Sequence, residues 1–213
     1  MSQHTLTLLR FTYKKLKEKL TVSDSKKLFH EQFPYVIPGL YKRIVDETLV
    51  ELNLLFHQND FTQDYLFCIG LTETFKELMK GYNPEKHLDP LFDSLCSSTN
   101  FEAKKIKTIS KKSQEEFNDK SSKDILKLLK GKNDHKLYPS RIVNLGIYLL
   151  ISNAYDLKGE NEPEINKTIS KIFENLNLSF NKAEKDIGIY KSTLSKMEQA
   201  KELIEEQRTR NQK

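Results

Sequence analysis

The sequence contains no tryptophan, only seven glycines, six prolines and two cysteines among its 213 residues. So little glycine and proline argues against a turn-dense β protein, because strands joined by tight turns use both residues heavily. The two closest glycines, Gly70 and Gly81, are eleven residues apart. Phosphate-cradling loops need several glycines close together, so that backbone N–H groups converge on the anion. The glycine spacing therefore excludes Walker and dinucleotide-binding loops.

Long apolar runs are also missing. The longest, from Ile142 to Ile151, is far shorter than the roughly 20 residues that a membrane-spanning helix needs. Nothing resembles a secretory signal. We therefore expect a soluble protein without a transmembrane segment, which can still lie against a membrane surface. Cys68 and Cys96 each stand in an apolar run, and we interpret them as buried free thiols in a reducing compartment.

Charge of both signs is abundant, but the surplus is small. The chain has 35 basic and 30 acidic residues, a formal net charge of +5. Such a balance does not by itself indicate a nucleic-acid-binding protein. Hydrophobic residues make up 37% of the chain, which is too much for a disordered protein. The length is sufficient for one good-sized domain, or for a domain with an appendage.

Helix start and stop signals recur along the chain, and no segment shows the period-two pattern of a strand with hairpin turns. Ser23, Asp24 or Ser25 is expected to cap a first helix that ends near Pro34. Further helices are expected over residues 38–57, 138–155 and 163–178. The segment 60–96 is expected to form two helices with a break near Asn83-Pro84 and Asp89-Pro90. The Lys-rich, partly flexible segment 101–136 is expected to form two short, largely exposed helices. We predict an all-α fold, with a compact multi-helix bundle over residues 21–178.

The C-terminal residues 179–213 are predicted to form one long helix, because no proline follows Pro163. An apolar seam with heptad-like 3-4 spacing runs along it, through Phe180, Ala183, Ile187, Tyr190, Leu194, Met197, Lys201 and Ile204. The seam fits either a terminal helix packed on the bundle or a protruding coiled-coil arm. We favour the arm, although Gly188 and Lys201 interrupt the pattern.

Metal-binding and catalytic patterns do not occur. His30 has no second histidine four residues on, and Glu85 and His87 are two residues apart, on different faces of a helix. Neither cysteine has a base nearby in the sequence, and no serine lies in a nucleophile elbow. We expect no catalytic residue, no metal and no cofactor. A hydrolase would require a fold that brings Cys68 or Cys96 beside a histidine.

An acidic cluster in the second expected helix has a simpler interpretation than metal binding. Asp46, Glu47 and Glu51 stand close together in the sequence. However, Lys42 precedes Asp46 by four residues, and Arg43 precedes Glu47 by four residues. This is the spacing of ion pairs along a helix, and we expect these charges to pair with one another.

The segment 101–136 contains eleven lysines against six acidic residues. Such a segment could bind nucleic acid, a membrane face or an acidic protein. It could also be a solvated face without a partner. Phe101 and Phe117 are its only aromatic rings apart from His135, so stacking on single-stranded bases has little support. We interpret the segment as a solvated face. The alternative function for the chain is a basic helical protein that binds nucleic acid through residues 101–136.

The N-terminal extension, residues 1–20, is basic. Leu6, Leu9, Tyr13, Leu16 and Leu20 follow a 3-4 spacing with basic residues between them. This pattern predicts an amphipathic helix on an anionic lipid surface. A frayed leader, or sequence upstream of the true start codon, explains the extension equally well.

Specific motifs run from Thr21 to about Cys96, namely TVSDSK, FP-x-VIP-x-LY, VDE-x-LVEL and GY-x-PE-x-HL-x-x-LF. With the apolar segment 142–155 and the long heptad-patterned helix, they closely resemble the thylakoid formation protein family. This family, also called the photosystem II biogenesis factor family, is found in cyanobacteria and plastids. The residues before Thr21 and the Lys-rich middle depart from the family pattern. The leader is unlike a plastid transit peptide, which favours a cyanobacterial protein.

The resemblance implies a non-catalytic accessory role in thylakoid membrane organisation, photosystem II biogenesis and repair, and acclimation to strong light. It implies a peripheral location on the cytoplasmic side of the thylakoid membrane. The implied partners are the FtsH-type thylakoid protease complex and photosystem II assembly components. No nucleic acid is expected, and self-association stays open.

Two sets of residues are expected to contact partners. The first matches the family motif and consists of Tyr41, Lys42, Arg43, Asp46 and Glu47. The second lies on the seam of the C-terminal helix and consists of Ile187, Tyr190, Leu194 and Met197.

Overall fold

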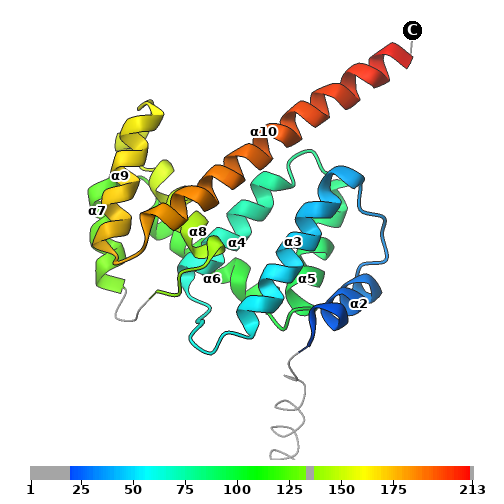
Figure 1. Ribbon diagram of the computed structural model, residues 1–213, viewed down its shortest axis with the longest axis horizontal. Helices are drawn as coiled ribbons and strands as arrows, with labels where there is room; N and C mark the ends of the chain where they lie inside the picture. The colour runs from blue at the N-terminus through cyan, green and yellow to red at the C-terminus, as the bar shows by residue number, and fades with distance from the viewer. Residues whose placement is uncertain (1–19, 133–136, 212–213) are drawn as a thin grey trace, which may run out of the picture. The chain divides into compact units, whose positions relative to one another are not determined.

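The structure is a computed structural model that describes residues 20–132 and 137–211. Within these residues it contains α-helices and short 3₁₀ helices and no strand, so the all-α prediction is confirmed. The helices are α2 (Val22–Gln32), α3 (Gly39–Phe56), α4 (Tyr65–Leu78), η1 (Glu85–His87), α5 (Leu88–Ser97), α6 (Ala103–Phe117), α7 (Ser122–Lys132), α8 (Arg141–Ser152), η2 (Tyr155–Leu157), α9 (Glu162–Asn175) and α10 (Phe180–Asn211) (Figure 1). The amphipathic helix expected in the N-terminal extension lies outside the described residues.

The chain divides into two compact units. Unit 1 comprises the residues up to Phe61 together with Tyr82–Ala103, and unit 2 comprises Thr62–Gly81 together with the residues from Lys104 onward. Each unit is therefore built from two separate stretches of sequence. The domain boundary predicted at residue 178 falls between α9 and α10, which both belong to unit 2.

In unit 1, α2 begins with a capping box. The Asp24 backbone N–H donates to the Thr21 hydroxyl at 3.1 Å, and the Thr21 backbone N–H donates to the Asp24 carboxylate at 3.0 Å. The cap is thus Thr21, and the prediction of Ser23, Asp24 or Ser25 is wrong. A threonine followed three residues later by an acidic side chain satisfies two helix-end groups at once, which a single serine does not. The helix ends before Pro34, as predicted.

Unit 1 is held together by α2, α3 and α5. Its core consists of the buried side chains Phe29, Phe33, Leu49, Leu52, Leu91 and Leu95. One buried polar residue, Asn53 on α3, donates to the Leu20 carbonyl at 2.8 Å and to the Ser25 hydroxyl at 2.9 Å. Since a buried amide must find partners, these bonds fix the start of α2 against α3.

The break expected between Asn83 and Pro90 is present. Gly81 has a φ of 79°, in the left-handed region that favours glycine. Pro84 then precedes the short η1, and Pro90 lies in the first turn of α5, where a proline is tolerated. Pro84 is the cap residue of η1.

In unit 2, α4 and α8 cross with their backbones in direct contact. A Cβ on Gly70 would lie 2.0 Å from the Ile142 carbonyl oxygen, and a Cβ on Gly146 would lie 2.3 Å from the Leu66 carbonyl oxygen. Neither position has room for a side chain, so both glycines are required for this approach. Helix α8 is the most apolar of the described helices, and its buried side chains are Ile142, Val143, Asn144, Leu145, Ile147, Leu150 and Ile151.

The Lys-rich segment forms two helices, α6 and α7, as predicted. One face of α6 packs on α4, where the Ser110 and Thr72 hydroxyls lie 2.6 Å apart and Gln114 donates to Glu73 at 3.1 Å. The first turn of α7 is capped from a distance, because the Asp156 carboxylate accepts from the backbone N–H and the hydroxyl of Ser122, each at 2.7 Å. Burial raises the pKa of Asp156, but these hydrogen bonds outweigh it and lower the pKa.

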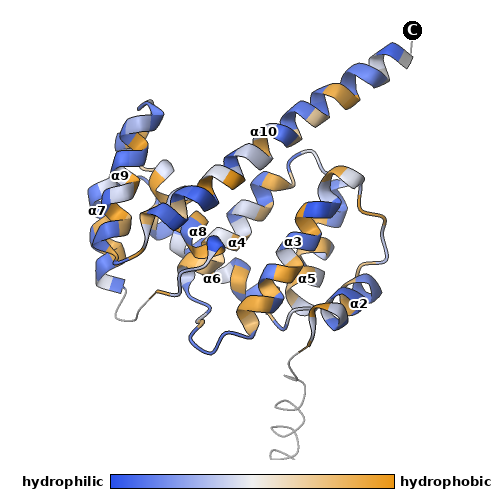
Figure 2. Ribbon diagram, viewed as in Figure 1, coloured by the Kyte–Doolittle hydropathy of each residue, from blue (hydrophilic) through white to orange (hydrophobic). Residues whose placement is uncertain are grey.

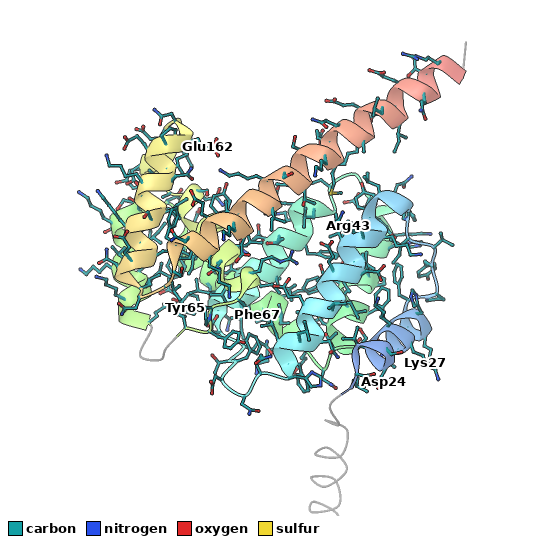
Figure 3. All side chains as sticks on the ribbon, viewed as in Figure 1. Asp24, Lys27, Arg43, Tyr65, Phe67 and Glu162 are labelled. Carbon is teal, nitrogen blue, oxygen red and sulfur yellow. The ribbon has the colours of Figure 1, made fainter. Side chains whose placement is uncertain are left out.

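Helix α10 extends over 32 residues, which confirms the predicted long C-terminal helix. Its first half packs within unit 2, where Asn144 of α8 donates to Asp186 at 2.8 Å. Lys191 forms an ion pair with Glu162, which is labelled on the first turn of α9 in Figure 3. From Glu198 onward the described side chains are exposed, except Ala200 and Lys201, which are half-buried. The last turns run on past the other helices of unit 2 (Figure 1). The packed-helix interpretation thus describes the first half, and the arm interpretation describes the last turns.

Candidate interaction surfaces

The motif residues on α3 divide between the core and the surface of unit 1. Tyr41 is buried, and its ring packs edge-on against Tyr82 with 5.1 Å between ring centroids. Lys42, Arg43 and Glu47 are exposed, and Asp46 is half-buried. Figure 3 labels Arg43 in the first turns of α3. The accessible part of this predicted partner surface is therefore charged, and Tyr41 supports it from beneath. Its role in binding stays a prediction.

Of the two lysine or arginine pairs expected four residues apart on α3, the structure contains one. Arg43 Nε donates to Glu47 Oε1 at 2.7 Å, and this bond raises the pKa of Arg43. Lys42 and Asp46 form no ion pair in the described structure, contrary to the prediction. An exposed pair gains little over solvation of the separate charges, so spacing alone does not guarantee a bond.

A surface that the sequence did not lead us to predict lies at the joint between α2 and α3. Val36 is 90% exposed and Tyr35 is 49% exposed. The Tyr35 ring stacks on His87 with 4.0 Å between centroids, and Phe33 meets the same imidazole edge-on at 6.2 Å. The sequence signal for this surface was the pair Pro34 and Pro38, which flank three uncharged residues. The prolines prevent a helix that would have turned these side chains inward.

The predicted seam of α10 is mainly part of the core. Ile187, Tyr190 and Met197 are buried, and Leu194 is half-buried. Burial, and next the nearby Glu77 carboxylate, raises the pKa of the Tyr190 hydroxyl, which is typical of a neutral core residue. Contact between a partner and the buried seam residues would require movement of α10. Partner binding by these four residues stays a prediction.

The accessible apolar surface of α10 lies further along, in what we call the α10 tip, residues 198–211. Leu203 is 60% exposed and Ile204 is 42% exposed. The exposed carboxylates Glu202, Glu205 and Glu206 surround them. Figure 2 shows these last turns as mostly hydrophilic with an apolar stretch between. Glu206 forms an ion pair with Arg210 at 3.8 Å, so the tip combines an apolar pair with charges of both signs. The first half of the same helix is fixed in unit 2.

The two thiols lie in different units, Cys96 in unit 1 and Cys68 in unit 2, and both are buried. Gln63 Nε2 donates weakly to Cys68 Sγ at 3.9 Å. Burial raises the pKa of Cys68 to about 11. A thiol in this state is a poor nucleophile, because only the thiolate attacks.

We expect neither thiol of the folded chain to react with Ellman's reagent at pH 8 on the minute timescale. The fraction of Cys68 as thiolate at that pH is about one thousandth, given a pKa of about 11. Both thiols should react at once in denaturant, and a Cys68→Ser variant should then release half the signal. A fast stoichiometric reaction of the native chain would instead indicate an activated cysteine and revive the hydrolase hypothesis.

Within 20–132 and 137–211, no cluster of three or more His, Cys, Asp or Glu side chains has an arrangement that could hold a metal ion. Of the helices in these ranges, none combines the length and the apolar character needed to span a membrane.

Comparison with known proteins agrees with the fold and the motifs. Residues 21–213 match the family described as Thylakoid formation protein. Protein Thf1 of Prochlorococcus marinus strain MIT 9312 is 78% identical over 198 residues, which are 93% of this chain and 98% of the relative. Protein Thf1 of Synechococcus sp. strain CC9605 is 38% identical over 191 residues, 87% of each chain. A solved structure of Psb29 superposes with a TM-score of 0.78 at 29% identity, covering 91% of this chain and 99% of that one. The chain therefore belongs to the thylakoid formation protein family.

Proposed function

We propose that this protein is a non-catalytic accessory factor for thylakoid membrane organisation and for photosystem II biogenesis and repair. It works through protein contacts, which include contacts with FtsH-type membrane proteases, at the cytoplasmic side of the thylakoid membrane. Family membership supports the thylakoid role. The protease contact and the side of the membrane follow from the family resemblance of the motifs between Thr21 and Cys96.

The observation that supports a binding role is that α10 has an anchored first half and an exposed apolar pair at its tip. The first half of this helix is fixed by Asp186 and Lys191 to α8 and α9, and the tip presents Leu203 and Ile204 to solvent. Apolar side chains exposed on an anchored helix can enter a groove of a partner with little loss of conformational entropy. Both thiols are buried, and the pKa of Cys68 is high, which supports a role without covalent chemistry.

The proposed function is tested by affinity capture with the tagged full-length chain from detergent-solubilised thylakoids. We expect mass spectrometry to find FtsH-type protease subunits or photosystem II assembly components enriched at least tenfold over a tag-only control. Nuclease treatment should not change this recovery. Recovery of ribosomes or nucleic acid alone would contradict the proposal and favour the nucleic-acid alternative.

A further inference from the structure

The first ten residues of helix α6, 103–112, carry charge of one sign only. Residues 104–112 include five lysines and no acidic residue. The inward face of the helix consists of the buried residues Ile106, Ser110, Ser113 and Phe117, and Ser110 lies against Thr72 of α4. At 100° per residue, Lys104, Lys105, Lys111 and Lys112 all project away from this buried face. We call these four exposed side chains the α6 lysine face.

The α6 lysine face is not neutralised by Glu115 and Glu116, the acidic residues one turn further along the helix. None of its four ammonium groups forms an ion pair within the described residues. Other lysines of the same unit do, such as Lys132 with Glu116 and Lys191 with Glu162. The residue at the centre of the face, Thr108, is neutral, and its hydroxyl donates to the Lys104 carbonyl at 2.8 Å. Neighbouring ammonium groups on one helix face lie within a Debye length of about 8–10 Å and repel one another. Such a face is stabilised by any extended anionic surface.

The composition of the face distinguishes between kinds of anionic partner. Lysine is depleted in protein–protein interfaces, which prefer arginine and aromatic residues. Sites for single-stranded nucleic acid use aromatic side chains on which the bases stack. The face has neither arginine nor an aromatic ring, since the only aromatic residue of α6, Phe117, is buried. Flexible lysines without geometric demands suit a diffuse array of anionic lipid headgroups.

We propose that the α6 lysine face docks unit 2 onto the anionic headgroups of a lipid bilayer. Each lysine near such a surface raises the partition coefficient by about fivefold. Two lysines contribute about 25-fold, and four contribute several hundredfold. That is weak binding by itself, so the face orients unit 2 on a membrane more than it retains the chain there. The inference does not rest on the proposed protein contacts.

The test is sedimentation of the full-length chain with vesicles of 40% phosphatidylglycerol in phosphatidylcholine, against vesicles of phosphatidylcholine alone. The variants are Lys104→Gln/Lys111→Gln and the matched Lys167→Gln/Lys171→Gln on α9, which removes the same charge elsewhere in unit 2. Because these side chains are exposed, circular dichroism should give both variants the wild-type melting curve.

We expect the chain to bind the anionic vesicles and not the neutral ones, with an affinity that falls as salt increases. The α6 variant should bind about 25-fold more weakly, and the α9 variant should bind within about twofold of wild type. The proposal is overturned if anionic vesicles are not bound at low salt, or if both variants lose affinity equally. It is also overturned if the α6 variant loses affinity for a single-stranded oligonucleotide but not for vesicles. That last outcome would assign the face to nucleic acid.

Discussion

A Gly70→Ala variant is expected to lose about 3 kcal/mol or more of unfolding free energy in unit 2. The added methyl group would lie 2.0 Å from the Ile142 carbonyl oxygen and 3.0 Å from the Gly146 backbone nitrogen. These are backbone atoms of α8, so no side-chain rotamer relieves the clash and the two helices must separate. Overpacking of a core costs about 1–3 kcal/mol where side chains can adjust, and more where they cannot. Urea unfolding followed by circular dichroism measures the effect.

A matched control comes from a helical glycine with free space around it. A Cβ on Gly188 of α10 meets nothing within 4 Å. Gly188→Ala should therefore raise the unfolding free energy by about 0.5–1 kcal/mol, because alanine loses less backbone entropy in a helix. If Gly70→Ala and Gly188→Ala change the unfolding free energy alike, the conclusion that the backbones of α4 and α8 are in direct contact is wrong.

Charging the α10 tip is expected to abolish partner capture without unfolding the chain. Leu203 and Ile204 are exposed, so a Leu203→Asp/Ile204→Asp variant removes no core contact. Its melting curve should match wild type, because exposed substitutions usually stay within about 0.5 kcal/mol. A carboxylate forced into an apolar contact is left desolvated, and recovery of the partner should drop at least tenfold. Affinity capture from solubilised thylakoids measures the recovery of the partner.

The control for added charge is Gln199→Asp/Gln207→Asp, which places two carboxylates at exposed polar positions of the same tip. Recovery with this variant should stay near wild type if the apolar pair makes the contact. Equal loss in both variants would indicate that only net charge matters. Met197 is buried, so a charge there would be expected to lower stability and capture together, and could not separate the two roles.

The sequence predicted those features that depend on local chemistry. Prolines at 34 and 38 separate the first two described helices, Pro84 marks the break before α5, and Arg43 pairs with Glu47 one helical turn away. Each depends on residues within four positions of one another. Position-specific propensity and spacing are sufficient for these.

Features set by distant residues did not follow from the pattern. The close crossing at Gly70 and Gly146 brings together positions 76 residues apart (146 − 70), and Asp156 caps α7 at Ser122 from 34 residues away. Which face of a helix is buried depends on the neighbouring helices. For this reason Met197, which was predicted on a partner surface, is buried. The division into two units also depends on such contacts, because each unit contains two separate stretches of the chain.

The most direct test of the proposed function uses purified components. The full-length chain is titrated against a detergent-purified FtsH-type protease complex, and binding is followed by interferometry. We predict saturable binding by the wild-type chain and by Gln199→Asp/Gln207→Asp, with an affinity at least tenfold lower for Leu203→Asp/Ile204→Asp. Absence of saturable binding by the wild-type chain would contradict a protease contact. Equal binding by the wild-type chain and the Leu203→Asp/Ile204→Asp variant would contradict the role of the α10 tip.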